Sequence, residues 1–321
     1  MKKIFLFLFL ISSAFAEQNL LDIYQKDGLK EVEKIFDKKL TSKEYWDNKL
    51  QFIDTKFGYF EGINYILACN KSKTSLKLYK KNDKNTFELD NDFSAFVGKK
   101  EGDKQKEGDL KTPIGVYKIT KKLNKVDSFY GPLAFVTSYP NTFDKVQSKE
   151  GHGIWVHGLP LNKKRDDYTK GCIAINNENL KHIENQINFK KALVYIDKKK
   201  YIKVNKNELS TILSQFYIWR LAWKSSDIQT YLSFYDTTFK RNDGISLANF
   251  KNYKKRVFKK QGYKQISFTN INIIPYPMQN KQNVFFISFH EEYKSSTYSF
   301  SGDKELYIHL KNNTFTILTE K

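Results

Sequence analysis

The N-terminal part of the chain has apolar residues at helical spacing. They recur mostly every three or four positions, at Leu29, Val32, Ile35, Phe36, Leu40, Trp46, Leu50, Ile53 and Phe57. This period gathers apolar side chains on one face of a helix, and Thr41-Ser42-Lys43-Glu44 matches a helix-capping box. Residues 17–61 are therefore predicted to form two or three short helices. Such helices cannot bury a core alone, so we expect them to pack on the next domain or on a second copy of the chain.

Short apolar runs replace the helical period from residue 62 onward. The predicted strands are residues 64–69, 75–79, 86–89, 93–97, 116–119, 132–137, 153–157 and 192–196. Turn residues separate them, as in Thr112-Pro113-Ile114-Gly115, and residues 179–185 have the pattern of a short helix. Residues 62–198 are therefore predicted to form a mainly β domain with one or two helices. The lysine-rich residues 199–206 are predicted to be a linker.

The last part of the chain, residues 207–321, combines both patterns. Apolar residues at helical spacing predict helices over residues 209–223, 228–235 and 250–259. The strands predicted after them are residues 283–292, 296–301, 305–311 and 314–319, with Asn312-Asn313 as a hairpin turn. Helices followed by a curled antiparallel sheet indicate an α+β cone.

Residues 1–16 have the pattern of a secretory signal peptide. Lys2 and Lys3 precede an apolar run, Ile4 to Ile11, that is too short to cross a bilayer as a helix. Ala14-Phe15-Ala16 then offers small residues at a cleavage site. The alternative is a buried N-terminal strand or helix. Since the sequence has no other long apolar run, we expect an exported protein that is not integral to the membrane.

Charge adds an expectation about partners. The 321 residues include 55 Lys and Arg against 35 Asp and Glu, a formal net charge of +20. Such an excess favours an anionic partner, which is nucleic acid, a membrane surface or an acidic polymer. Export argues against nucleic acid and leaves the cell wall, whose peptide stems carry carboxylates, and anionic lipid. Because the lysines are scattered, they are equally compatible with a solvated surface.

The chain has two cysteines in contrasting surroundings. Cys69 ends a predicted buried strand, whereas Cys172 follows Gly171 in a predicted loop. A disulfide between them is an open alternative in an oxidising compartment, although a single bridge would be a poor framework for a chain of this length. We expect an inert buried thiol at Cys69 and a reactive thiol at Cys172.

His157 and Cys172 are the candidate catalytic pair. A thiol needs a base to become a nucleophile near neutral pH, and a histidine can take that proton and return it to a leaving amine. Gly171 lets the backbone approach closely, so the amides of Gly171 and Cys172 are candidates for stabilising an oxyanion. The backbone carbonyl of Gly158 is a candidate for orienting the imidazole. His182, His290 and His309 are dispersed and no phosphate-binding glycine loop is visible, so neither a metal nor a cofactor is predicted.

The residues around this pair resemble the catalytic domain of the YkuD family of L,D-transpeptidases. The shared motifs are His157-Gly158, Thr169-Lys170-Gly171-Cys172-Ile173 and, upstream, Thr112-Pro113-Ile114-Gly115. Residues 69–76 also resemble the first hairpin of that family, so the resemblance covers roughly residues 62–198. It implies a β-sandwich with short helices that acts on the peptide stems of peptidoglycan. The bond attacked joins the third residue, commonly meso-diaminopimelate, to the D-alanine that follows.

One position departs from the family pattern. Where the family usually has an arginine that is expected to bind or orient the substrate, this chain has Ala174. Lys170 and Arg165 are candidates for supplying the missing positive charge to a substrate carboxylate and for favouring the thiolate. Further candidates for substrate binding are Thr169, Tyr130, His152 and Trp155. The alternative for each is packing within a β domain or a solvated loop position.

The order of segments narrows the resemblance. A helical segment, a YkuD-like domain and a C-terminal unit similar to NTF2-like domains together resemble the cell-shape-determining L,D-carboxypeptidases of helical Campylobacter and Helicobacter species. This implies a periplasmic enzyme, dimeric through its N-terminal helices, in which water resolves the thioester and tetrapeptide stems become tripeptides. Two alternatives stay open. One is an L,D-transpeptidase that crosslinks two third-position residues, and the other is a non-catalytic scaffold that binds the wall.

Overall fold

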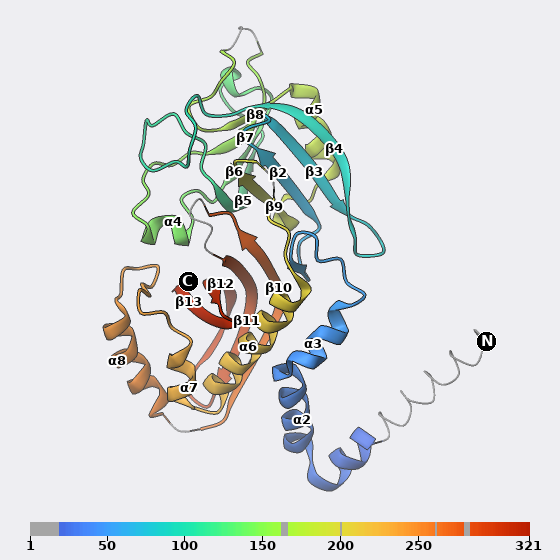
Figure 1. The fold of residues 1–321 in the computed structure, drawn as a ribbon, viewed down its shortest axis with the longest axis vertical. Coiled ribbons are helices and arrows are strands. Elements are labelled where there is room, and N and C mark those ends of the chain that lie inside the picture. The colour runs from blue at the N-terminus through green and yellow to red at the C-terminus, as the bar shows by residue number, and fades with distance from the viewer. Residues whose placement is uncertain (1–18, 162–165, 200, 261, 279–282) are drawn as a thin grey trace, which may run out of the picture.

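The computed structural model describes residues 19–161, 166–199, 201–260, 262–278 and 283–321. They form a barrel domain and a C-terminal domain that pack against each other, with helices at the N-terminal side lying along the C-terminal domain (Figure 1). The predicted signal peptide, residues 1–16, lies outside the described residues. Among the described helices, none combines the length and apolar character needed to cross a membrane.

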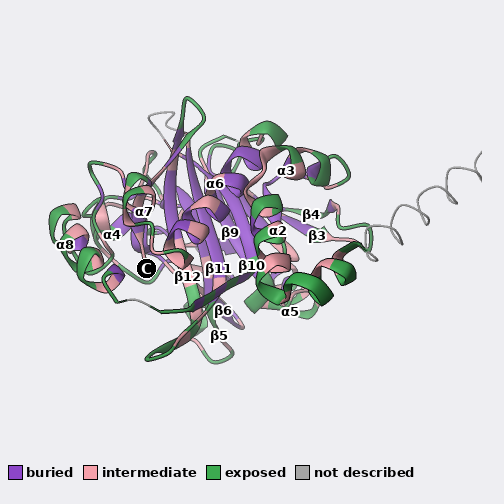
Figure 2. Ribbon diagram, turned by 90° about the horizontal axis from the view of Figure 1, so that it is seen from below, coloured by how far each residue is buried: buried purple, intermediate pink, exposed green. Residues whose placement is uncertain are grey.

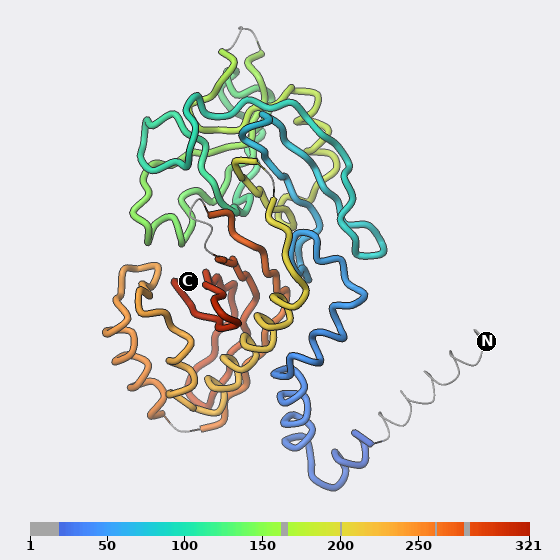
Figure 3. The backbone as a smooth tube through the Cα atoms, in the orientation of Figure 1, coloured from blue at the N-terminus to red at the C-terminus, as the bar shows by residue number. Residues whose placement is uncertain are grey.

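Three helices open the described chain, at residues 19–27, α2 (Leu29–Thr41) and α3 (Lys43–Leu50). α2 and α3 pack on α6 (Lys206–Lys224) of the C-terminal domain, which runs beside them (Figure 3). Trp46 of α3 stacks on Tyr217 of α6 with ring centroids 5.5 Å apart. The helices therefore pack on the C-terminal domain and not on the domain that follows them in sequence.

The chain leaves α3 earlier than the apolar pattern predicts, so Phe57 does not continue its helical face. The Asp54 carboxylate accepts a hydrogen bond from the Lys56 amide, and such a local side-chain contact competes with the helix. The next residues form β1 (Tyr59–Phe60), which pairs antiparallel with β10 (Lys264–Tyr276) of the C-terminal sheet.

The middle of the chain forms a closed barrel. Its strands are β2 (Tyr65–Asn70), β3 (Ser75–Lys81), β4 (Phe87–Phe96), β5 (Gly115–Leu123), β6 (Ala134–Thr137), β7 (Trp155–His157), β8 (Ile173–Ile175) and β9 (Ala192–Asp197). Hydrogen bonds connect them in the order β2, β3, β4, β8, β7, β6, β5, β9 and back to β2. The mainly β character is as predicted. The expected sandwich closes at its edges into one ring, because β9 pairs with both β2 and β5.

Short helices decorate the barrel, and its inside is apolar. They are η1 (Ser128–Tyr130), α4 (Thr142–Val146), α5 (Asn177–Gln186) and η2 (Phe189–Lys191). The two strands predicted at residues 86–89 and 93–97 are a single strand, β4, with a register shift opposite the bond between Leu78 and Tyr79. The barrel core includes Leu67, Leu78, Tyr117, Phe135, Val156, Ile173 and Val194.

The C-terminal domain wraps helices around a curved antiparallel sheet. Its helices are α6, α7 (Ile228–Ser233) and α8 (Leu247–Phe258), and its strands are β10, β11 (Val284–Ser295), β12 (Ser299–Lys311) and β13 (Thr314–Glu320). The sheet order is β1, β10, β11, β12, β13, so β1 supplies one edge. Figure 2 shows buried residues concentrated on the strands and exposed residues on the outer faces of α2, α5 and α8.

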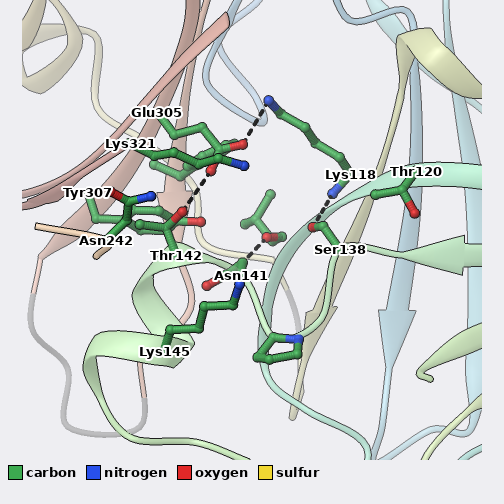
Figure 4. Close-up of a pocket in the computed structure, with 13 residues that line it drawn as sticks. Lys118, Thr120, Ser138, Asn141, Thr142, Lys145, Asn242, Glu305, Tyr307 and Lys321 are labelled. Carbon is green, nitrogen blue, oxygen red and sulfur yellow. Dashed lines mark hydrogen bonds and ion pairs between the residues drawn. The ribbon is translucent and has the colours of Figure 1, made fainter. Parts of the chain in front are cut away.

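Besides the core of each domain, an apolar cluster lies between the two domains and joins them. Phe143 of α4 stacks on Tyr307 of β12 with ring centroids 5.1 Å apart, and Asn141 donates a hydrogen bond to the Tyr276 hydroxyl at 3.0 Å. At its rim, Lys118 pairs with Glu305 at 2.8 Å beside a cavity of about 250 Å³ (Figure 4). Polar side chains of the two domains thus also pair across this contact, as Lys118 does with Glu305 and Asn141 with Tyr276.

Candidate active site

The predicted nucleophile and base lie on neighbouring strands of the barrel. β7 and β8 run parallel, with Val156 opposite Ile173 and His157 opposite Ala174. Both strands lie toward the barrel end away from the C-terminal domain (Figure 1). Cys172 directly precedes β8 and its Sγ accepts a hydrogen bond from the Trp155 amide at 3.4 Å. The sheet therefore holds the sulfur beside the strand that carries the imidazole.

The backbone determines which nitrogen of His157 carries the proton. Nδ1 lies 2.7 Å from the carbonyl oxygen of Gly158. A carbonyl oxygen only accepts hydrogen bonds, so Nδ1 is the protonated nitrogen and Nε2 keeps its lone pair. The side chain is 1% exposed, and the Tyr130 ring meets it edge-on with centroids 5.0 Å apart. The imidazole is thus held in one tautomer and one orientation.

Thr169 holds the turn that presents Cys172. Its hydroxyl donates to the carbonyl of Cys172 at 2.6 Å and accepts from the amide of Gly171 at 3.0 Å. Gly171 has φ 140°, and a Cβ there would lie 2.9 Å from the carbonyl oxygen of Lys111, which is why glycine occupies the position. The turn is therefore braced from inside the protein by a side chain that is 2% exposed.

Two of the predicted site residues are hydrogen-bonded to each other in this turn. The buried hydroxyl of Thr169 is engaged with the backbone of Gly171 and Cys172, and the Gly171 amide donates to it. Substrate binding by Thr169 and an oxyanion contact of Gly171 stay predictions. The amide of Cys172 stays a prediction as an oxyanion donor.

The two cysteines are both thiols, so the disulfide alternative is contradicted. Cys69 is buried in β2, and burial raises the pKa of its thiol to about 12. Cys172 is partly exposed at the barrel surface, and its Sγ also lies 3.4 Å from the carbonyl oxygen of Gly153. The surroundings of Cys69 therefore disfavour the ionisation that a thiol needs in order to react.

Comparisons with known proteins identify both domains. Residues 64–196 match the L,D-transpeptidase catalytic domain (YkuD), and residues 211–321 match the Cds6 C-terminal NTF2-like domain. The structure is similar to the helical cell shape determining protein Pgp2 from Campylobacter jejuni, at 38% identity and TM-score 0.81, covering 88% of this chain and 99% of that one. The chain belongs to the L,D-transpeptidase family. The fold class predicted from the sequence, a YkuD-like domain followed by an NTF2-like domain, is confirmed.

Two further relatives of the family differ in how much they share. Bd1075 of Bdellovibrio bacteriovorus is 27% identical with TM-score 0.64, covering 81% of this chain and 92% of that one. YafK of Escherichia coli K12, whose name refers to an L,D-transpeptidase, is 33% identical over 82 residues, 26% of this chain. The match spans 30% of the length of YafK. The likeness to Pgp2 and Bd1075 therefore extends over both domains, whereas that to YafK is local.

The remaining predicted residues are distributed around the pair. Tyr130 and Trp155 are half-buried and in contact, with ring centroids 5.1 Å apart, so they form a wall beside His157. Lys170 is exposed next to the nucleophile turn. The His152 side chain is 81% exposed on a loop, 3.8 Å from the Glu107 carboxylate. Arg165 lies outside the described residues.

Ala174 occupies a confined position. It is fully buried, opposite His157 on β7 and Phe96 on β4. A long side chain would have to displace one of these neighbours, so the barrel accommodates alanine here by close packing. In the part of the chain that the structure describes, no group of three His, Cys, Asp or Glu side chains is placed to hold a metal ion.

Asn177, which no motif in the sequence marks, contacts the segment after His157. Its Oδ1 accepts a hydrogen bond from the amide of Leu159 at 2.8 Å. The pair Asn176-Asn177 is a signal for a helix start, and Asn176 does cap α5. No sequence pattern indicates that the second asparagine reaches back to another strand.

Proposed function

We propose that the protein is a thiol L,D-carboxypeptidase that removes the terminal D-alanine from tetrapeptide stems of peptidoglycan. The observation that carries the proposal is the His157–Gly158 hydrogen bond of 2.7 Å beside Cys172 on the adjoining strand. It leaves Nε2 as the proton acceptor, which is the requirement for a histidine that activates a thiol.

The reaction follows from these roles. Nε2 of His157 takes the proton of the Cys172 thiol, and the sulfur forms a bond to the carbonyl carbon of the third stem residue. The tetrahedral intermediate then collapses, the bond to D-alanine breaks, and the imidazolium gives its proton to the leaving amine. Water, deprotonated by the same imidazole, attacks the thioester and releases a tripeptide and the thiol.

Ala174 supports trimming over crosslinking. The family arginine expected at this position would bring a guanidinium toward the substrate, whereas the buried methyl group of Ala174 brings no charge. The net charge of +20 favours approach to the carboxylates of the wall. We place the protein in the periplasm, with a role in cell shape, in line with the likeness to Pgp2.

The test is to incubate the purified protein with tetrapeptide muropeptides and to follow products by mass spectrometry. We expect tripeptides and D-alanine from the wild type, and a loss of at least about 10³-fold in Cys172→Ala and His157→Ala. Cys69→Ala is the matched control, since its thiol is buried away from the pair, and it should keep its activity. Crosslinked dimers in place of tripeptides would favour the transpeptidase, and no product at all would favour a scaffold.

A homodimer is part of the same proposal. Large apolar side chains stay exposed on the N-terminal helices, namely Leu21, Tyr24, Leu29 and Phe36. Contact with a second copy would remove them from water. Light scattering on the purified chain should give twice the monomer mass, and Leu29→Lys with Phe36→Lys should give the monomer mass. A wild-type monomer at micromolar concentration would contradict the dimer.

A further inference from the structure

We infer that Asn177 is a positioning residue of the catalytic pair, and that it acts on His157 through one peptide group. The inference rests on the proposed function. Asn177 opens α5, directly after β8, and so belongs to the same segment as the nucleophile. Its side chain reaches the segment that follows the base. One side chain thereby joins the two halves of the site.

Asn177 and His157 hydrogen-bond to opposite ends of the same peptide group, which is rigid. The amide nitrogen of Leu159 and the carbonyl of Gly158 belong to the same planar peptide bond, in which N–H and C=O point in opposite directions. Asn177 Oδ1 holds the N–H at 2.8 Å, and the C=O lies 2.7 Å from His157 Nδ1. Fixing one end of the plane therefore fixes the direction of the other. The chain of bonds runs from the asparagine through the peptide to the imidazole.

Packing shows how little room this peptide has to rotate. A Cβ added to Gly158 would lie 2.1 Å from Asn177 Oδ1, and one added to Gly131 would lie 2.5 Å from the same atom. The Gly158 amide also donates to the carbonyl of Tyr130 at 2.9 Å. Glycine is required at both positions because the asparagine oxygen takes the space of a side chain. The peptide is thus clamped between Asn177 and the Tyr130 turn.

The chemical consequence concerns the charged form of His157. A carbonyl that accepts from Nδ1–H stabilises the imidazolium more than the neutral ring, and so favours the charged form. Hydrogen bonds in a chain polarise one another, so the Asn177–Leu159 bond strengthens this acceptor. Without Asn177 the imidazolium is less stable and the thiolate–imidazolium pair forms less readily. Ionisation of Cys172 then needs a higher pH.

The experiment compares Asn177→Ala with Asn177→Asp, which keeps an oxygen that can accept from the Leu159 amide. The first readout is the rate of Cys172 alkylation by iodoacetamide as a function of pH, which needs no peptidoglycan. We expect the midpoint in Asn177→Ala to rise by about one pH unit. The second readout is D-alanine release, where we expect kcat to fall by roughly 10- to 100-fold with KM within about twofold. Asn177→Asp should recover most of kcat.

Asn176→Ala is the matched control. Asn176 caps α5 by accepting from the Glu178 amide at 2.9 Å, so its loss weakens the same helix without touching the peptide at Gly158. We expect it to lower the melting temperature and to leave both the alkylation midpoint and kcat at wild-type values. Equal losses of kcat in Asn176→Ala and Asn177→Ala, with an unchanged midpoint, would mean a purely structural role and would overturn the inference.

The two proposals fail in different ways. If the wild type releases no D-alanine but Asn177→Ala still raises the alkylation midpoint, the positioning role stands and the proposed reaction does not. If D-alanine is released and Asn177→Ala matches the wild type in both readouts, the positioning role is wrong and the reaction stands. If the midpoint of Cys172 alkylation is unchanged in His157→Ala, then His157 does not act on the thiol and both proposals are wrong.

Discussion

Burial sets the ionisation of single residues at two places remote in sequence. The thiol of Cys69 has a pKa raised to about 12 because β2 buries it, which separates it from Cys172. Glu291 in β11 is buried as well, and this raises the pKa of its carboxyl from 4.5 to about 7, while the charges of Lys304 and Lys254 oppose the shift. The sequence predicts the buried environment of Cys69 but not that of Glu291, which looks ordinary within its strand.

The shift of Glu291 predicts a pH dependence of stability. A carboxyl whose pKa is higher in the folded state than in the unfolded state stabilises the fold below about pH 4.5, and this contribution is lost as the pH rises through about 7. At 1.36 kcal/mol per unit the loss is on the order of 3 kcal/mol. Urea unfolding at pH 4.5 and pH 8 should show that Glu291→Gln removes this part of the dependence.

Glu292→Gln serves as the control for this measurement. Glu292 is the exposed neighbour, and hydrogen bonds from Ser301 and His290 lower the pKa of its carboxyl. Its removal should leave the decline between pH 4.5 and pH 8 in place. A wild type that declines no more than Glu291→Gln would contradict the assignment to Glu291.

At the candidate active site the proposed reacting residues are easier to recognise in the sequence than the residues that support them. Cys172 and His157 are recognisable because cysteine and histidine are chemically distinctive and stand in motifs of fixed order. Thr169 and Asn177 act through the direction of a hydroxyl and of a peptide plane, which depend on the path of the chain. The close approach of the backbone at Gly171 can be predicted from the glycine itself, whereas the hydrogen bond of its amide to Thr169 cannot.

Among the elements, β10 shows why a strand can escape a pattern search. The side chains of β10 that join the C-terminal core are Ile266 and Phe268 at even positions, then Ile271 and Ile273 at odd positions, and residues 271–276 are all buried. A register shift between Thr269 and Asn272 causes the change. An interruption of this kind breaks the alternation that identifies a strand. α6 and α8 were easier to predict, because both carry apolar residues at helical spacing.

Docking of α2 on α6 depends on a buried charge cluster. Asp37 of α2 pairs with Arg220 and, at 2.7 Å, with Lys224, and all three side chains are largely buried. Glu33 approaches the same lysine at 2.6 Å from a more exposed position. Removing Asp37 leaves Arg220 without its carboxylate and Lys224 with Glu33 alone, whereas removing Glu33 leaves both cations paired with Asp37.

We therefore predict that Asp37→Ala lowers the free energy of unfolding by about 3 kcal/mol. Glu33→Ala is the comparison and should cost less than about 1 kcal/mol, as expected for a partly exposed pair. Urea denaturation followed by tryptophan fluorescence reports on this contact, because Trp46 lies in the same helical layer. Equal effects of the two variants would show that the cluster contributes no more than surface charge.

The whole molecule is held together by the apolar cluster between the domains. Phe143 contributes from the barrel side and meets both Tyr276 and Tyr307 of the C-terminal sheet. Aromatic contacts between domains couple the unfolding of the two domains, since unfolding of one exposes the aromatic surface of the other. β7 and β8 lie toward the barrel end away from the C-terminal domain (Figure 1), so the interface can be weakened without altering the candidate pair.

Differential scanning calorimetry should show one cooperative transition for the wild type. Phe143→Ala removes the central ring and should lower stability by about 3–5 kcal/mol. We expect its unfolding to separate into two transitions. Phe129→Ala is a control, since Phe129 is an exposed ring outside the interface, and it should keep one transition. A single sharp transition in Phe143→Ala would mean that the domains are coupled by other contacts.

The pairing of β1 with β10 has a consequence for biogenesis. Residues on both sides of the barrel build one sheet and one helical layer, so the barrel is inserted into a discontinuous unit. As the chain emerges during synthesis, Trp46 and Leu50 have no surface to pack on until α6 follows, more than 150 residues later. The barrel can fold first, but the apolar faces of α2 and α3 stay exposed to water until α6 has been synthesised. A chain halted before α6 would therefore depend on chaperones, whatever the state of its active site.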